Sequence, residues 1–191
     1  MILGLTGNFG SGKSTAAKMF KDLGAVIIDV DEISHRVLAG ECYGEVISEF
    51  SSDILDYDLK IDRDLLREIV FNDRYKLKKL EIILHPRILN EIELELRRLD
   101  TKHSIVIIEA AVLIELGLLG IIDKLIVITS ICQKERLTWK SRIKEEEINK
   151  ILRLQMDEAA LEAKADFIID NNGTPDNTRA QINEIWKKLG A

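Results

Sequence analysis

The sequence predicts an α/β protein built on a five-stranded parallel sheet, and three features of its 191 residues point to this class. Short apolar runs of strand length alternate with longer helical stretches, as in successive strand–helix–strand units. A glycine-rich loop joins the first strand to the first helix. A helical stretch after the second strand is too long for a simple crossover and indicates an insertion in the core.

The loop at residues 7–15, with the sequence GNFGSGKST, fits the pattern Gly-x4-Gly-Lys-Ser/Thr of phosphate-binding loops. An apolar strand at residues 1–6 precedes it and a helix follows, which is the context that this motif requires. Its glycines let backbone N–H groups turn inward around the α- and β-phosphates, at the positive end of the helix dipole. Lys13 would reach the β- and γ-phosphates, and the Ser14 hydroxyl would hold Mg²⁺. A glycine-rich turn without a ligand is the alternative, but every fixed position of the motif is filled.

The composition argues against several classes of partner and site. A net charge of −6 argues against nucleic acid as the main partner. The longest apolar run, at residues 105–114, contains Glu109 and is too short to span a bilayer. Cys42 and Cys132 are isolated from each other and from His at ligand spacing, which argues against a disulfide framework or a zinc site. With no charged leader at the N-terminus, we expect a cytoplasmic protein that is not bound to membranes.

Acidic residues follow two of the predicted buried strands. The strand at residues 25–28 runs into Asp29 and Asp31 before a helix expected at residues 33–38. Ligands of open α/β sheets lie beyond the carboxyl ends of the strands, so these acids should face the crevice of the phosphate loop. An N-cap is the alternative role for either aspartate. The strand at residues 105–108 ends at Glu109, a position at which a carboxylate can order the water shell of Mg²⁺. A helix cap or a buried ion pair is the alternative role for Glu109.

Residues 41–99 have helical periodicity around a polar loop at residues 51–62. An insertion at this point is where a small kinase holds its phosphate acceptor. Pro86 is expected to break or begin a helix there. His85, from its spacing alone, is more typical of a structural residue than of a catalytic one.

The second half of the chain continues the strand–helix alternation. A charged helical stretch at residues 133–162 is typical of a solvated helix face, or, in a phosphoryl-transfer enzyme, of a lid that carries basic residues. The other predicted elements are a helical turn at residues 112–119, strands at 124–128 and 167–170, a turn at 171–175 and an amphipathic helix at 176–189 with Trp186 in the core.

This constellation resembles the dephospho-CoA kinase family, within the nucleoside-monophosphate-kinase-like architecture, nearly end to end. The segments that carry the resemblance are residues 5–15, 26–31, 61–63, Leu66, 70–71, 84–86, 112–115, Gln155 and 165–171. The resemblance implies a three-layer P-loop kinase fold. Its core would comprise about residues 1–32, 103–132 and 164–191, with an acceptor-binding insertion at about 33–102 and a helical lid at about 133–163.

The resemblance implies transfer of the γ-phosphoryl group of ATP to the ribose 3′-hydroxyl of dephospho-CoA, the last step of coenzyme A synthesis. Asp31 matches the proposed base for that hydroxyl and Asp29 its companion carboxylate. With Lys13, Arg136 of the lid would neutralise the transferring charge. The remaining implied contacts are Arg63 and His85 on the acceptor side, and Asn8, Phe9, Gly10, Ser11, Gly12, Lys13, Ser14, Thr15 and Asn171 for ATP, with Ser14 and Glu109 for Mg²⁺.

The chain departs from the family pattern in the lid. Lys140 stands where the family has a second arginine, and it cannot make a bidentate fork to phosphate. Arg142 is an alternative clamp. Another small-molecule or nucleoside-monophosphate kinase of the same architecture is the competing function. A GTP-dependent switch is disfavoured, because the chain has no Asn/Thr-Lys-x-Asp motif. We expect ATP and dephospho-CoA as partners of a monomer or small homo-oligomer.

Overall fold

A computed structural model describes residues 1–99, 104–131 and 145–190 of the chain, without the side chains at positions 145–147, 149 and 150. The described chain divides into two compact units. The core unit comprises residues 1–29 and 99–191, and the helical unit comprises residues 30–98.

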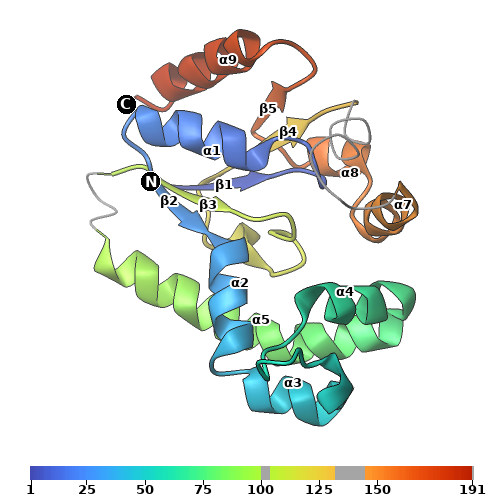
Figure 1. The fold of residues 1–191 in the computed structure, drawn as a ribbon. Helices are drawn as coiled ribbons and strands as arrows, with labels where there is room; N and C mark the ends of the chain where they lie inside the picture. Colours follow the sequence, from blue (N-terminus) through green and yellow to red (C-terminus); the bar gives the residue numbers. More distant parts are fainter. Residues whose placement is uncertain (100–103, 132–144, 191) are drawn as a thin grey trace. The chain divides into compact units, whose positions relative to one another are not determined.

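Five parallel strands form the sheet of the core unit in the order β2-β3-β1-β4-β5 (Figure 1). The strands are β1 (Ile2–Thr6), β2 (Val26–Asp29), β3 (Val106–Glu109), β4 (Lys124–Thr129) and β5 (Phe167–Asp170). Because β1 lies between β3 and β4, the loop that follows β1 emerges at the middle of the sheet. This position is where ligands bind in open parallel sheets.

Helices α1 (Lys13–Asp22) and α9 (Pro175–Lys188) lie side by side on one face of the sheet (Figure 1). They bury an apolar cluster that includes Leu3 and Leu5 of β1. The predicted core residue Trp186 is partly buried and packs on this cluster, with its ring 6.4 Å from that of Phe20. This packing anchors the helix that begins at the phosphate-binding loop.

The opposite face of the sheet is covered by the chain that follows β3. A Cβ atom on Gly4 would lie 2.7 Å from Ile122 Cδ1 and 2.9 Å from Leu113 Cδ1, so this segment packs directly on β1. The segment consists of turns and a short 3-10 helix, η2 (Leu118–Gly120). Helix α8 (Glu158–Glu162) contacts β4, and α7 (Glu145–Leu154) precedes it. The three predicted layers are therefore present.

The helical unit contains four α-helices that pack mainly on the longest of them, α5. A turn with one antiparallel bridge, between Leu55 and Ile61, connects two of the helices. The elements are α2 (Val30–Ala39), α3 (Tyr43–Phe50), the 3-10 helix η1 (Ser52–Ile54), α4 (Arg63–Asn72) and α5 (Arg74–Arg98). Asp62 caps α4 by accepting hydrogen bonds from the N–H groups of Asp64 and Leu65.

The expectation that Pro86 breaks or begins a helix is wrong, because α5 runs through it from Arg74 to Arg98. Proline removes the N–H that would bond the carbonyl of Ile82. Both Pro86 and Ile82 are exposed, so water can replace that donor. The buried residues Leu84 and Ile88 hold the other face of the helix in place. Tertiary packing thus overrides the local cost of the proline.

The boundary after β2 also differs from the expectation. Helix α2 begins at Val30, directly after the strand ends at Asp29, and not at Ile33. Asp31 and Glu32 consequently lie in the first turn of a helix, where negative charge complements the helix dipole. Of the helices in the described part of the chain, none combines the length and apolarity needed to cross a bilayer.

Candidate active site

At two of its glycines, the phosphate-binding loop combines a positive φ with neighbouring atoms too close for a side chain. Gly7 has φ +154° and Gly12 has φ +102°. A Cβ on Gly7 would lie 2.3 Å from the Ile128 carbonyl oxygen, and one on Gly12 would lie 2.2 Å from Asn171 Nδ2. Both glycines therefore allow the loop backbone to lie close to neighbouring atoms, in addition to allowing the positive φ. The loop packs tightly on the ends of β4 and β5.

The Lys13 ammonium lies back against the loop that precedes it. Its Nζ donates hydrogen bonds to the carbonyl oxygens of Gly7 at 2.9 Å and Asn8 at 3.3 Å. A cation is thereby fixed beside a run of backbone that leads into the N-terminus of α1. Such an arrangement of ammonium, loop N–H groups and helix dipole favours an anion with several oxygens.

Ser14 and Glu109, both predicted to serve a metal ion, are brought together by the fold. The Ser14 hydroxyl donates a 2.7 Å hydrogen bond to Glu109 Oε1. Glu109 is 6% exposed and ends β3, in register with Asp29 at the end of β2. Hydroxyl and carboxylate oxygens suit a hard divalent cation. Among the described residues, no group of three His, Cys, Asp or Glu side chains could hold a metal ion by itself. The pair Ser14 and Glu109 therefore fits an ion that takes its remaining ligands from water and from substrate oxygens.

Side chains from distant parts of the core unit hold the loop. Asn171 Nδ2 donates to the Ser11 carbonyl at 2.7 Å, while Asn171 Oδ1 accepts from the Thr178 hydroxyl at 2.8 Å. The backbone N–H of Phe9 donates to Gln155 Oε1 at 2.8 Å. Neither contact could be predicted from the sequence around these residues. Gln155 and Asn171 do, however, both belong to the segments that carry the family resemblance. Asn171 thus reaches the loop itself, whatever its contact with a nucleotide.

The other predicted ATP-binding residues are positioned by the conformation of the loop backbone and by its hydrogen bonds. Gly10 has φ +81°, and the Ser11 N–H closes a turn onto the Asn8 carbonyl at 3.1 Å. The Ser11 side chain is fully buried, so the loop would offer its backbone to a phosphate. Thr15 is exposed in the first turn of α1, next to Ser14.

The predicted acceptor-side residues of the helical unit fall into two places. Arg63, the first residue of α4, lines a cavity of about 290 Å³. His85 is on α5, is not part of that lining, and is half-buried. Burial lowers the pKa of His85 below its usual value, with opposing effects of Glu81, which raises it, and Lys78, which lowers it. His85 therefore does not line the cavity that Arg63 lines.

Sequence reasoning missed three polar residues that line this cavity, namely His35, Tyr43 and Lys60. The signal for His35 was available, because it is four residues after Asp31 and so on the same face of α2. Lys60 and Tyr43 come from the polar turn and from α3, and their approach depends on the tertiary fold. The predicted lid residues Arg136, Lys140 and Arg142 lie outside the described residues.

Comparisons with known proteins identify one family over nearly the whole chain. The sequence profile of the dephospho-CoA kinase family matches residues 1–177. The dephospho-CoA kinase of Aquifex aeolicus is 37% identical over 192 residues, covering 98% of this chain and 96% of that protein.

Two solved structures have the same fold. A protein from Thermus thermophilus gives a TM-score of 0.84 at 27% identity, covering 99% of this chain and 97% of that one. The dephospho-CoA kinase of Campylobacter jejuni gives 0.72 at 28% identity, covering 98% and 96%. These likenesses confirm the predicted P-loop kinase fold. Since a family profile and relatives above 30% identity span nearly all of the sequence, the chain belongs to the dephospho-CoA kinase family of ATP-dependent phosphotransferases.

Proposed function

We propose that the protein transfers the γ-phosphoryl group of ATP to the 3′-hydroxyl of the ribose of dephospho-CoA, which yields coenzyme A. Membership of the family supports the choice of reaction. The observation that carries the donor half is the phosphate-binding loop, in which Lys13 is held across the carbonyls of Gly7 and Asn8.

On the donor side, Lys13 exchanges these two carbonyls for oxygens of the triphosphate. The N–H groups of the loop and of the first turn of α1 bind the remaining phosphate oxygens. Little covalent chemistry is left to the protein in phosphoryl transfer, so positioning and charge neutralisation provide most of the rate enhancement. Asn171 contributes by holding the Ser11 carbonyl, which fixes the loop before the nucleotide arrives.

On the acceptor side, Asp31 orients the ribose hydroxyl and accepts its proton. A ribose hydroxyl is a poor nucleophile at neutral pH, so a carboxylate within hydrogen-bond reach has a defined task. Arg63 binds the anionic part of the acceptor, and Asp29 is the companion carboxylate. Arg136 is proposed as the cation of the lid that faces the transferring phosphoryl group, with Lys140 or Arg142 as the second.

Mg²⁺ is the proposed metal partner of ATP, held through the Ser14 hydroxyl and through the water shell ordered by Glu109. The hydrogen bond between these two side chains supports a shared role, because each orients an oxygen of the other. When bound, the ion would neutralise charge on the β- and γ-phosphates.

The test is an acceptor screen with the purified protein. ATP, Mg²⁺ and dephospho-CoA should give ADP and a product phosphorylated on the ribose 3′-oxygen, identified by phosphorus NMR and mass spectrometry. Nucleoside monophosphates, shikimate and simple sugars serve as the competing acceptors. Turnover of one of these, with none of dephospho-CoA, would contradict the proposal.

A further inference from the structure

One peptide group of the phosphate-binding loop, the one that joins Asn8 to Phe9, is held on both of its sides. Its N–H, on Phe9, donates a hydrogen bond to Gln155 Oε1 at 2.8 Å. Its carbonyl oxygen, on Asn8, accepts from Lys13 Nζ at 3.3 Å and from the Ser11 N–H at 3.1 Å. Gln155 and Lys13 are therefore connected through a single peptide group.

The geometry of the peptide group links the two contacts. No peptide bond in the described part of the chain is cis, and in a planar trans peptide the N–H and the C=O point in opposite directions. A side chain that holds the Phe9 N–H thus also fixes the direction of the Asn8 carbonyl. Hydrogen bonds on the two sides of one peptide polarise and strengthen each other. Without an acceptor at residue 155, the peptide can rotate, and its carbonyl then no longer holds the Lys13 ammonium in one place.

Gln155 is itself positioned by the packing of two helices of the core unit. It directly follows α7 and precedes α8. In α7, Ile148 and Ile151 are buried and lie on the same face of the helix, three residues apart. Helix α8 buries Leu161 and contacts β4. The acceptor oxygen is thus placed by packing outside the loop that it holds.

The contact of Gln155 differs from the other side-chain anchor of the loop. Asn171 holds the Ser11 carbonyl at 2.7 Å, and this carbonyl does not accept from Lys13 in the contacts that the ammonium makes with Gly7 and Asn8. Gln155 holds one of the two peptide groups whose carbonyls receive that ammonium. The glutamine is therefore placed to act on the lysine as well as on the loop.

We infer that Gln155 is a positioning residue for Lys13, because it orients the peptide group whose carbonyl holds the lysine beside the phosphate site. The inference rests on the proposed function, in which Lys13 neutralises charge on the transferring phosphoryl group. Gln155 acts through the backbone and does not contact the substrate. A cation that is fixed in advance needs no reorganisation at the moment of transfer, so the effect is expected in kcat more than in the binding of the acceptor.

The first test removes the acceptor at residue 155. Gln155→Met keeps the length of the side chain, and we expect kcat to fall by about tenfold with the KM for dephospho-CoA unchanged. Gln155→Asn keeps the amide but draws it back by about 1.5 Å, beyond hydrogen-bond distance of the Phe9 N–H. It should reduce kcat by the same factor, which separates the hydrogen bond from the polarity of the side chain.

A double-mutant cycle with Lys13→Ala distinguishes positioning of the lysine from general support of the loop. If Gln155 acts through Lys13, Gln155→Met should change kcat little once the lysine is absent. Independent effects would multiply, and the double variant would then be about ten times slower than Lys13→Ala alone. Melting temperatures of the four proteins in the cycle establish that each is folded.

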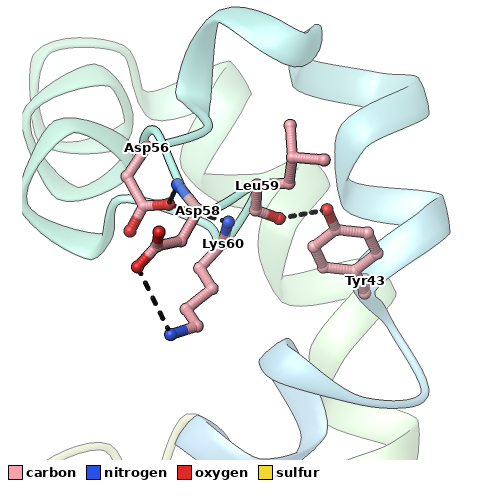
Figure 2. Close-up of polar contacts among 5 residues, drawn as sticks. All are labelled: Tyr43, Asp56, Asp58, Leu59 and Lys60. Atoms are coloured by element: carbon pink, nitrogen blue, oxygen red, sulfur yellow. Dashed lines mark hydrogen bonds and ion pairs between the residues drawn. The ribbon is translucent and has the colours of Figure 1, made fainter.

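Asp56→Ala is the matched control, because Asp56 also accepts hydrogen bonds from backbone N–H groups in a turn. Its Oδ1 accepts from the N–H groups of Asp58 and Lys60, both at 2.9 Å, in the helical unit (Figure 2). Loss of this acceptor should lower the melting temperature and leave kcat and the affinity for ATP unchanged.

An unchanged kcat in Gln155→Met, or a further tenfold loss in the Lys13→Ala background, would overturn the inference. Tighter binding of ATP by Gln155→Met, measured by calorimetric titration, would contradict it as well, since the glutamine would then occupy an N–H that the nucleotide needs. All of these results leave the wild-type turnover of dephospho-CoA in place. A wild-type protein without that turnover would refute the proposed function itself.

Discussion

The Ser14 hydroxyl donates a 2.7 Å hydrogen bond to the Glu109 carboxylate and so joins the first turn of α1 to the end of β3. The two residues are far apart in sequence, and β3 lies next to β1 in the sheet. Glu109 is only 6% exposed, and burying a carboxylate is costly unless its oxygens accept hydrogen bonds, as one does here from Ser14. This contact is the link between the phosphate-binding loop and the acidic edge of the sheet.

Glu109→Gln should raise the Mg²⁺ concentration required for half-maximal activity by about tenfold, because the amide keeps the size of the side chain but not its charge. The measurement is a Mg²⁺ titration of initial rates at saturating ATP. Glu115→Gln, an exposed change in the turn after β3, is the control. An unchanged Mg²⁺ requirement with a lower melting temperature would make Glu109 a structural residue only.

Lys13→Ala should reduce kcat by about a hundredfold or more, since the transferring phosphoryl group loses its nearest fixed cation. Steady-state kinetics with ATP and dephospho-CoA measure the effect. Lys18→Ala removes an exposed lysine from the same helix and should leave the rate unchanged. The proposed role of Lys13 is refuted by a variant that retains most of its kcat.

Gly12→Ala should weaken ATP binding by about tenfold or more, because the new Cβ displaces Asn171 from the loop. Gly24→Ala separates this effect from backbone strain. Gly24 has a similar φ of +108°, but no atom lies within 4 Å of its added Cβ. Both variants should lose about 1 kcal/mol of stability from the left-handed backbone. Calorimetric titration with ATP then decides, and equal affinities in the two variants would contradict the role of the Asn171 contact.

Asp31→Asn should lower kcat by about a hundredfold or more while the affinity for ATP changes little. The amide keeps the position of the side chain in the first turn of α2 but cannot accept the proton of the ribose hydroxyl. Glu32→Gln, the neighbouring change in the same turn, is the control. Weaker ATP binding at an unchanged kcat would instead identify Asp31 as a metal or structural residue.

Stability should fall as the pH is lowered from about 7.5 to about 5, in part because of His85. Burial holds the pKa of His85 below its usual value, so protons bind to the unfolded chain first as the pH falls. The stability that the neutral ring provides is thus complete above the usual histidine pKa and is lost below it. Urea unfolding at several pH values should show a shallower decline for His85→Gln. An identical decline in both proteins would contradict this assignment.

Much of the fold was predictable because its signals are local. The strands around Leu3, Ile107 and Val127 are apolar on both faces, as strands in a covered parallel sheet must be. The first helix ends at a glycine for an equally local reason: Gly24 has φ +108°, and its N–H is bonded to the Lys21 carbonyl at 3.0 Å. The local rules failed at Pro86 and at the start of α2, where packing on one helix face outweighed the preference of a single residue.

The phosphate-binding loop, the acids at the strand ends and the family could be identified without a structure, because each depends on residues close together along the chain or in a fixed order. The strand order became known only from the folded protein. It sets Asp29 in register with Glu109 and puts Ser14 within reach of the same carboxylate. The folded protein also shows that Arg63, and not His85, lines the cavity with Lys60 and Tyr43. Such contacts join residues from different elements, and their free energy comes from packing that no short stretch of sequence contains.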